Sequence, residues 1–207
     1  MPDLDSNLHG SITDGTNIAL ILIDVINDME FPEGQDLLEY ALPMARRIAA
    51  LKRRAKAHRI PAIYVNDNFG QWRADFHRIV HHVLDNDVSG RPIAELLRPD
   101  EDDYFVLKPK HSGFFMTPLE LLLEDLGVRT LIIAGVATNI CVLFTANDAY
   151  MRNLRIIVPE DCVAANTEAD NQFALNQIRN VLKGGTQPSN ELNLEHLIAM
   201  ERENVES

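Results

Sequence analysis

The sequence predicts a single-domain α/β fold, a three-layer α-β-α sandwich around a mainly parallel sheet. The chain has 207 residues, which suits one domain with a full hydrophobic core. Short apolar runs alternate with segments of helical periodicity, as in successive βαβ units. The first run is apolar at every position, which is typical of a strand buried on both faces of a parallel sheet. We expect a polar arm over 1–16, the domain over 17–185 and a C-terminal tail over 186–207.

The expected strands follow one another along the chain with a helix between most neighbours. Each strand is a short apolar run, and each helix carries apolar residues three or four positions apart. The strands are predicted at 17–24, 60–66, 104–108, 130–134 and 155–159. The helices are predicted at 37–58, 76–84, 118–127, 139–151 and 168–182, the last being the final one. Right-handed crossovers then place these helices on both faces of the sheet.

One helix has a clear start and end in the sequence. Thr117 can cap it, Pro118 suits the first helical position, and Glu120 would complete a capping box. The same helix is expected to end at Gly127, because glycine is the usual residue just past a helix end.

Composition restricts the class of partner. The net charge of -12 disfavours nucleic acid and anionic membranes, because both require a basic surface. No apolar run is long enough to span a membrane, and the N-terminus lacks the regions of a signal peptide. Two distant cysteines do not form a disulfide framework. We therefore expect a soluble cytoplasmic protein, and composition says nothing more about its function.

Three reactive side chains are expected at one edge of the sheet. Asp24 closes the first predicted strand, Lys108 closes the third, and Cys141 opens the helix after the fourth. In open parallel sheets, sites form at the carboxyl ends of the strands. Each residue alone has a simpler interpretation: a turn cap, a solvated lysine and an inert buried thiol. Their coincidence at one edge favours a catalytic site.

The chemistry of the three groups would suit acyl transfer. A helix N-terminus and a nearby ammonium are both expected to lower the pKa of the Cys141 thiol. Asp24 could accept the thiol proton and later deliver it to a leaving group, while Lys108 holds Asp24 and stabilises the thiolate. Backbone N–H groups at the helix start would face the oxyanion of a tetrahedral intermediate.

Three blocks of the sequence resemble the isochorismatase-like cysteine hydrolase family, which includes nicotinamidases and N-carbamoylsarcosine amidases. The blocks are ILIDVINDME, VLKPKHSGFFMTPLELLLEDLGV and LIIAGVATNICVLFTANDAYMRNLRIIVPEDC. They occur in family order, and the likeness covers residues 18–177. The combination is specific, whereas any one block alone would be weak.

The resemblance implies roles for individual residues. It places the family's catalytic aspartate on Asp24, its lysine on Lys108 and its nucleophile on Cys141. It also implies a cis peptide bond between Val136 and Ala137, which would turn the Ala137 N–H toward the oxyanion beside the N–H of Cys141. Relatives are commonly dimers or tetramers, so the resemblance further implies a homo-oligomer.

Two departures from the family pattern bear on substrate and metal. Ile26 stands where many relatives carry glutamine, and Phe69 stands where nicotinamidases have the histidine of a metal-binding Asp-x-His. With Ile26, any polar contact that the glutamine makes with substrate is absent. The Phe69 departure argues against a nicotinamidase and against a required metal, and we expect no cofactor. His77 and His81 have the spacing of a helical metal pair, but no third ligand is evident, so a solvated helix face is favoured.

Candidate residues of the substrate pocket come from loops after the strands. They are Phe31, Trp72, His111 and Phe115. Cys162 has no charged partner in the pattern and is interpreted as structural. The basic segment 46–59 is interpreted as the solvated face of a crossover helix.

The leading hypothesis is a cysteine hydrolase that cleaves a C–N bond of an amide or carbamoyl compound through a thioester on Cys141. An alternative within the family is vinyl-ether hydrolysis, which needs a proton donor but no covalent nucleophile. A non-catalytic ligand-binding α/β protein is a further alternative, although no glycine-rich nucleotide motif follows a predicted strand. A thiol redox protein is a weaker one, because no C-x-x-C occurs.

Overall fold

The computed structural model describes residues 16–70, 73 and 75–206. The strands are β1 (Ile18–Ile23), β2 (Ala62–Asp67), β3 (Tyr104–Lys108), β4 (Thr130–Val136), β5 (Arg155–Ile157) and β6 (Val163–Ala164). The helices are α1 (Gly34–Ala57), α2 (Phe76–Asp85), α3 (Arg91–Leu96), α4 (Leu119–Asp125), α5 (Leu143–Met151), α6 (Glu168–Asn180) and α7 (Leu194–Glu206). A π-helical turn (Thr138–Val142) precedes α5.

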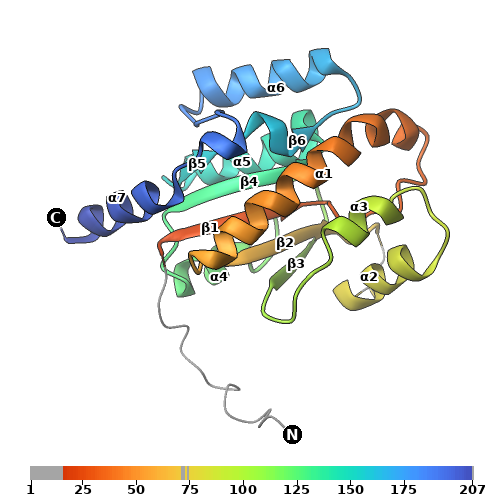
Figure 1. Ribbon diagram of the computed structural model, residues 1–207, viewed down its shortest axis with the longest axis horizontal. Coiled ribbons are helices and arrows are strands. Elements are labelled where there is room, and N and C mark those ends of the chain that lie inside the picture. The colour runs from red at the N-terminus through yellow and green to blue at the C-terminus, as the bar shows by residue number, and fades with distance from the viewer. Residues whose placement is uncertain (1–15, 71–72, 74, 207) are drawn as a thin grey trace, which may run out of the picture.

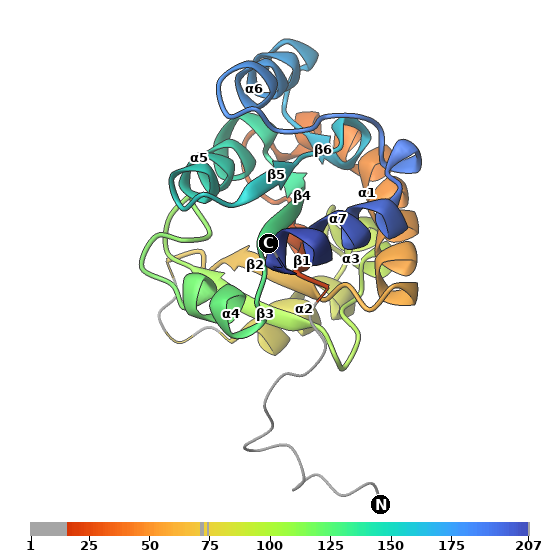
Figure 2. The ribbon, with the colours of Figure 1, turned by 90° about the vertical axis from the view of Figure 1, so that its left-hand side faces the viewer.

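The strands form a parallel sheet in the order β3-β2-β1-β4-β5, with β6 beside the end of β4. The sheet is covered on both faces by helices (Figures 1 and 2). The predicted three-layer α/β fold is therefore confirmed.

Alternate residues of β1 enter two separate cores. Ile18, Leu20 and Leu22 pack with α1 and α3, whereas Ile21 and Ile23 pack with α4, α5 and α6 on the opposite face. All these side chains are fully buried, which explains why β1 is apolar at every position.

Two helices were not expected. α3 spans six residues, too few for a clear periodicity. The prediction that the helix at 168–182 is the last is wrong, because α7 follows it within the expected tail. Glu201 of α7 is buried at 3% exposure, and its carboxylate accepts a hydrogen bond from the Thr130 hydroxyl at 2.7 Å. The C-terminal helix is thereby fastened to the start of β4.

The helix start near Pro118 differs in detail from the prediction. Pro118 occupies the cap position rather than the first helical position, and the Thr117 hydroxyl accepts the N–H of Leu119 at 3.2 Å. Glu120 does not complete a capping box; its carboxylate lies 2.9 Å from the Arg152 guanidinium. Gly127 follows the helix end with φ of +64°, as predicted.

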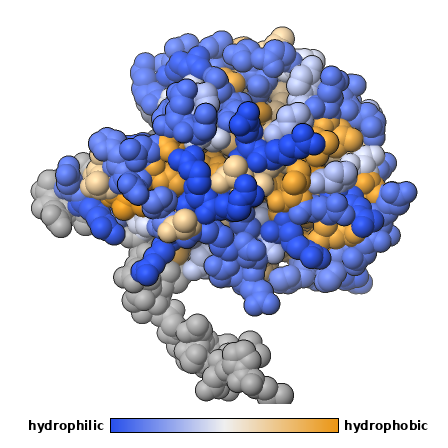
Figure 3. All heavy atoms as spheres, viewed as in Figure 1, coloured by the Kyte–Doolittle hydropathy of each residue, from blue (hydrophilic) through white to orange (hydrophobic). Residues whose placement is uncertain are grey.

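The basic segment of α1 is partly solvated and partly paired. Arg46 and Arg53 are exposed, whereas the buried Lys52 ammonium lies 2.5 Å from an Asp103 carboxylate oxygen. The face that carries α1 is largely hydrophilic, with hydrophobic patches between the polar groups (Figure 3). Within the described part of the chain, no helix is both long and apolar enough to cross a membrane.

Candidate active site

Asp24 lies directly after β1, and its side chain is almost buried. Its N–H donates to the Val65 carbonyl at 3.0 Å, which extends the β1–β2 pairing beyond the strand. Its φ of +50° lies in the left-handed region, which is uncommon for residues other than glycine and costs free energy. The backbone thus turns sharply at Asp24 while the carboxylate stays at the sheet edge.

Gly135 determines how closely β1 and β4 approach at the same edge. It pairs with Ile23 and has φ of +121°. A Cβ atom at this position would lie 2.0 Å from the Ile23 carbonyl oxygen, far inside contact distance. Only glycine therefore permits this pairing, immediately before the loop that leads to Cys141.

Lys108, the last residue of β3, has a fully buried side chain. Its Nζ lies 2.9 Å from Asp24 Oδ2, 3.4 Å from Cys141 Sγ and 3.5 Å from Asp67 Oδ2. A lysine ammonium carries three N–H donors, so it can serve one acceptor with each. The structure thus brings Asp24, Lys108 and Cys141 together. Lys110, by contrast, is exposed.

Cys141 lies in the π-helical turn before α5 and is half-buried. A helix is present over the predicted range 139–151, but its first turn is π rather than α. π-Helical turns are rare in proteins overall, and those that occur are often at functional sites. The peptide bond between Val136 and Ala137, at the start of this loop, is cis.

Side-chain hydrogen bonds fasten the loop after β3 to α5. The Thr145 hydroxyl donates to the Cys141 carbonyl at 2.7 Å and accepts the Gly113 N–H at 3.0 Å. The Ser112 hydroxyl donates to the Asp148 carboxylate. These contacts hold the loop carrying His111 next to Cys141.

Burial raises the pKa of the Cys141 thiol to about 12, and the charge of Asp24 adds to this effect. Lys108 acts in the opposite direction but does not cancel it. The expectation of a lowered thiol pKa is therefore wrong for the resting site: Cys141 is a thiol at neutral pH, and its sulfur becomes a thiolate only when a neighbouring base takes the proton.

Asp24 and Lys108 form a buried ion pair, and in each residue burial and the charge of the partner shift the pKa in opposite directions. Burial raises the pKa of the Asp24 carboxyl above its ordinary value, although the Lys108 charge acts against this. Burial also acts to lower the pKa of Lys108, but the neighbouring acidic groups, Asp24 first among them, together outweigh it, and the pKa lies above the usual value. A carboxylate with a raised pKa is a stronger proton acceptor, which suits an exchange with a thiol.

The candidate pocket residues have different surroundings. The Nδ1 atom of His111 lies 3.9 Å from Cys141 Sγ, and its ring is 5.4 Å from that of Phe144. Phe31 lines a cavity of about 700 Å³ beside Asn68 and Phe69, at the ends of β1 and β2. Phe115 is half-exposed in the loop after β3. Trp72 lies outside the described residues.

Two residues at the end of β2 lie beside this group although they were not among the site residues predicted from the sequence. Asn66 is fully buried and donates to the Ile26 carbonyl at 2.6 Å, which fixes the chain after Asp24. Asp67 contacts Lys108 and donates its N–H to Asp24 Oδ1 at 2.7 Å. The rule that polar strand ends form sites could have found both, because they close the second strand.

The predicted helical pair His77 and His81 and the second cysteine lie apart from this group. His81 is exposed and its ring contacts Asp85 at 3.2 Å, while His77 packs edge-on against Phe105. Cys162 is fully buried. Among the described residues, acidic, His and Cys side chains cluster at metal-binding distances only in the Asp100, Asp102 and Asp103 group, which pairs with Lys52 and Lys56.

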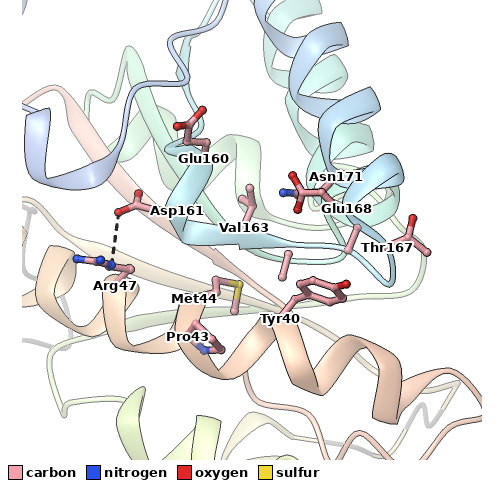
Figure 4. A pocket seen from close by; sticks show the side chains of 12 residues that line it. Tyr40, Pro43, Met44, Arg47, Glu160, Asp161, Val163, Thr167, Glu168 and Asn171 are labelled. Atoms are coloured by element: carbon pink, nitrogen blue, oxygen red, sulfur yellow. Dashed lines mark ion pairs between the residues drawn. The ribbon is translucent and has the colours of Figure 1, made fainter.

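A smaller hollow of about 250 Å³ lies between α1 and the segment from Glu160 to Asn171 (Figure 4). Arg47 and Asp161 approach within 4.0 Å at one side of it. Asn171 accepts a hydrogen bond from the Thr138 hydroxyl at 2.6 Å, so this hollow borders the π-helical turn. None of the predicted site residues lines it.

The fold and the site define an α/β protein whose sheet edge carries a thiol, a carboxylate and an ammonium in contact. The chain belongs to the isochorismatase family, because the isochorismatase domain model matches residues 18–187. It is 44% identical over 164 residues to the uncharacterized isochorismatase family protein YaaI of Bacillus subtilis (strain 168), covering 79% of this chain and 90% of YaaI.

Solved structures agree with this assignment. An isochorismatase family protein of Desulfovibrio vulgaris matches with a TM-score of 0.70 and 25% identity, over 90% of this chain and 100% of that one. N-carbamoylsarcosine amidase of Thermoplasma acidophilum matches with a TM-score of 0.65 and 26% identity, over 85% of this chain and 98% of that one.

Proposed function

We propose that the protein is a cysteine hydrolase that cleaves a C–N bond of a small amide or carbamoyl compound through a thioester on Cys141. The observation that carries the proposal is the position of the Lys108 ammonium, 2.9 Å from the Asp24 carboxylate and 3.4 Å from the Cys141 sulfur. The similarity to an N-carbamoylsarcosine amidase supports the same bond type.

In the first half of the reaction, Asp24 takes the thiol proton and the sulfur attacks the substrate carbonyl carbon. Lys108 stabilises the negative charge as it passes from carboxylate to sulfur. The oxyanion of the tetrahedral intermediate would be held by the backbone N–H groups of Ala137 and Cys141. Asp24 then returns the proton to the leaving nitrogen, the C–N bond breaks, and a thioester remains on Cys141.

In the second half, Asp24 takes a proton from water, whose oxygen attacks the thioester carbon. The carbon–sulfur bond breaks, and Asp24 returns the proton to the Cys141 thiolate. The acid product leaves and the starting site is restored. This cycle needs no metal or other cofactor.

The substrate is proposed to lie beside His111 and to extend toward the cavity lined by Phe31, Asn68 and Phe69. His111 lies close enough to the sulfur to contact a bound carbonyl compound. The cavity also contains Arg78 and His82, so it offers both apolar and polar contacts to the part of the substrate away from the cleaved bond.

The test is a hydrolysis screen over small primary amides, carbamoyl compounds and a vinyl ether such as isochorismate. We expect release of ammonia or amine from one of the first two classes, and Cys141→Ala should lower that turnover by about a thousandfold or more. A thioester at Cys141, trapped by acid quenching and detected by mass spectrometry, would support the covalent route.

Vinyl-ether hydrolysis is the second candidate, and the raised pKa of Asp24 is the observation that favours it. A protonated Asp24 could donate to an enol ether, after which water adds without any covalent nucleophile. Turnover of isochorismate that survives Cys141→Ala would establish this reaction and exclude the thioester. Ligand binding with no turnover of any compound would instead favour a non-catalytic protein.

The protein is further proposed to form a homodimer or homotetramer. Several large apolar side chains on α5, on α6 and directly after α6 are half-exposed or more in the single chain, and large exposed apolar patches are typical of surfaces that associate. They are Phe144, Met151, Phe173 and Val181.

A further inference from the structure

The Lys108 ammonium is shared by two carboxylates, of which the proposed reaction uses one. Asp67 ends β2 directly opposite Lys108 in the β2–β3 pairing. Its Oδ2 lies 3.5 Å from Lys108 Nζ. The carboxylate proposed to exchange the proton is that of Asp24, which contacts the same ammonium. A second carboxylate beside the same ammonium lowers the positive electrostatic potential that the ammonium produces at the Cys141 sulfur.

Both carboxylate oxygens and the backbone N–H of Asp67 are engaged with the site or with its own turn. Oδ1 accepts the Phe69 N–H at 2.6 Å, which fixes the chain after β2. The Asp67 N–H donates to Asp24 Oδ1 at 2.7 Å. The side chain is 31% exposed, whereas those of Lys108 and Asp24 are buried. Of the two carboxylates that contact Lys108, Asp67 is therefore the one that is partly exposed to solvent.

We propose that Asp67 is a positioning residue for Lys108. By accepting one N–H of the ammonium, it fixes the rotation of the other two, which then face Asp24 and the Cys141 sulfur. Its negative charge also offsets part of the positive potential at the sulfur and so keeps Cys141 protonated until substrate binds. Only the turnover part of this proposal rests on the proposed function.

The charge balance gives the direction of the effect. The groups that face the ammonium are Asp24, Asp67 and Cys141, and His111 faces the sulfur from the loop after β3. If Asp67 becomes neutral, the ammonium is opposed by one carboxylate instead of two, and the thiolate is stabilised. Below the thiol pKa, a decrease of one unit increases the thiolate fraction about tenfold.

The decisive variant is Asp67→Asn, because asparagine keeps an acceptor for the Phe69 N–H but removes both the negative charge and the oxygen that accepts from Lys108. The rate of Cys141 alkylation by iodoacetamide at about pH 8, followed by mass spectrometry, should rise about tenfold over the parent. An unchanged or slower rate would overturn the proposal. The measurement needs no substrate, so it is independent of whether the hydrolase proposal succeeds.

Two controls distinguish an electrostatic effect on the Cys141 thiol from a general loosening of the fold. Asp85→Asn makes the same change of charge on the exposed end of α2, away from Lys108, and should leave the Cys141 rate unchanged. Cys162 is fully buried and reports opening of the fold. If Cys162 alkylation accelerates in parallel with that of Cys141, the gain comes from loosening and the proposal is wrong.

With a hydrolysed substrate, the same variant should lower kcat on the order of tenfold and leave KM nearly unchanged, because Lys108 is less well oriented during the reaction. Faster alkylation combined with slower turnover is the signature of a positioning role. An unchanged kcat would show that Asp67 does not orient Lys108.

Discussion

At the scale of single residues, the protonation of Asp24 controls the proposed reaction. The carboxylate must be ionised to take the Cys141 proton, and burial raises its pKa above that of an exposed carboxyl. Lys108 must stay charged, and its pKa is also above its usual value. In the proposed reaction, Cys141 and Asp24 therefore exchange one proton beside a charged Lys108, and no permanent thiolate is needed.

The pH dependence of kcat/KM should reflect these two shifts. As the pH falls through the raised pKa of Asp24, the carboxylate binds a proton and activity is lost, at a higher pH than for an ordinary aspartate. As the pH rises, activity should persist to about pH 10, because the pKa of Lys108 lies above its usual value and the ammonium keeps its proton over this range. Rates measured from about pH 4 to about pH 10 check this. An acidic limb at the ordinary aspartate value would contradict the assignment of Asp24 as the base.

At the scale of elements, the strands β1 to β5 were predictable because each is a short apolar run, whereas β6 was not expected because it has only two residues. The ends of three elements placed Asp24, Lys108 and Cys141 together, since carboxyl ends of parallel strands share an edge. The sequence could not reveal that Glu120 contacts Arg152 instead of its own helix start, because that choice depends on α5 packing nearby. The thiol pKa was misjudged for a similar reason: burial of Cys141 depends on the assembled site.

The link between the β3–α4 loop and α5 should be essential to the site. Thr145→Val keeps the side-chain shape but leaves the buried Gly113 N–H without its acceptor and the Cys141 carbonyl without its donor. We expect unfolding to require about 1–3 kcal/mol less free energy, measured by urea denaturation. Turnover should fall as well.

Asn147→Ala is the matched control in the same helix, because its amide bonds only to the Leu143 carbonyl at an exposed position. Its stability and turnover should be close to those of the parent. Equal losses in the two variants would show that the loop contact has no special importance.

At the scale of the whole molecule, the two edges of the sheet formed by the strand ends differ in what they carry. The carboxyl ends carry the reactive groups, whereas α7 is fastened at the amino end through Glu201, Thr130 and Arg155. This contact could not be predicted from the sequence, because glutamate in a helix is usually an exposed surface residue. Stability and catalysis should therefore be separable by substitution.

Glu201→Ala tests this separation. The variant removes the acceptor of the buried Thr130 hydroxyl and the carboxylate 3.4 Å from Arg155. The free energy of unfolding should fall by about 1–3 kcal/mol, while kcat/KM at a temperature where the protein stays folded should be unchanged. Glu203→Ala, at an exposed position of the same helix, should change neither quantity. A loss of kcat/KM in the folded Glu201 variant would contradict the separation.

The absent side chain of Gly135 has a consequence for how this protein could be altered. Because β4 lies against the Ile23 carbonyl without an intervening Cβ, the spacing of the two chain segments that carry Asp24 and Cys141 is set by the sheet itself. The segments that line the cavity can then be exchanged or lengthened while the reactive atoms keep their spacing. Libraries randomised in those segments should yield new substrate ranges, whereas Gly135 should resist replacement by every other amino acid.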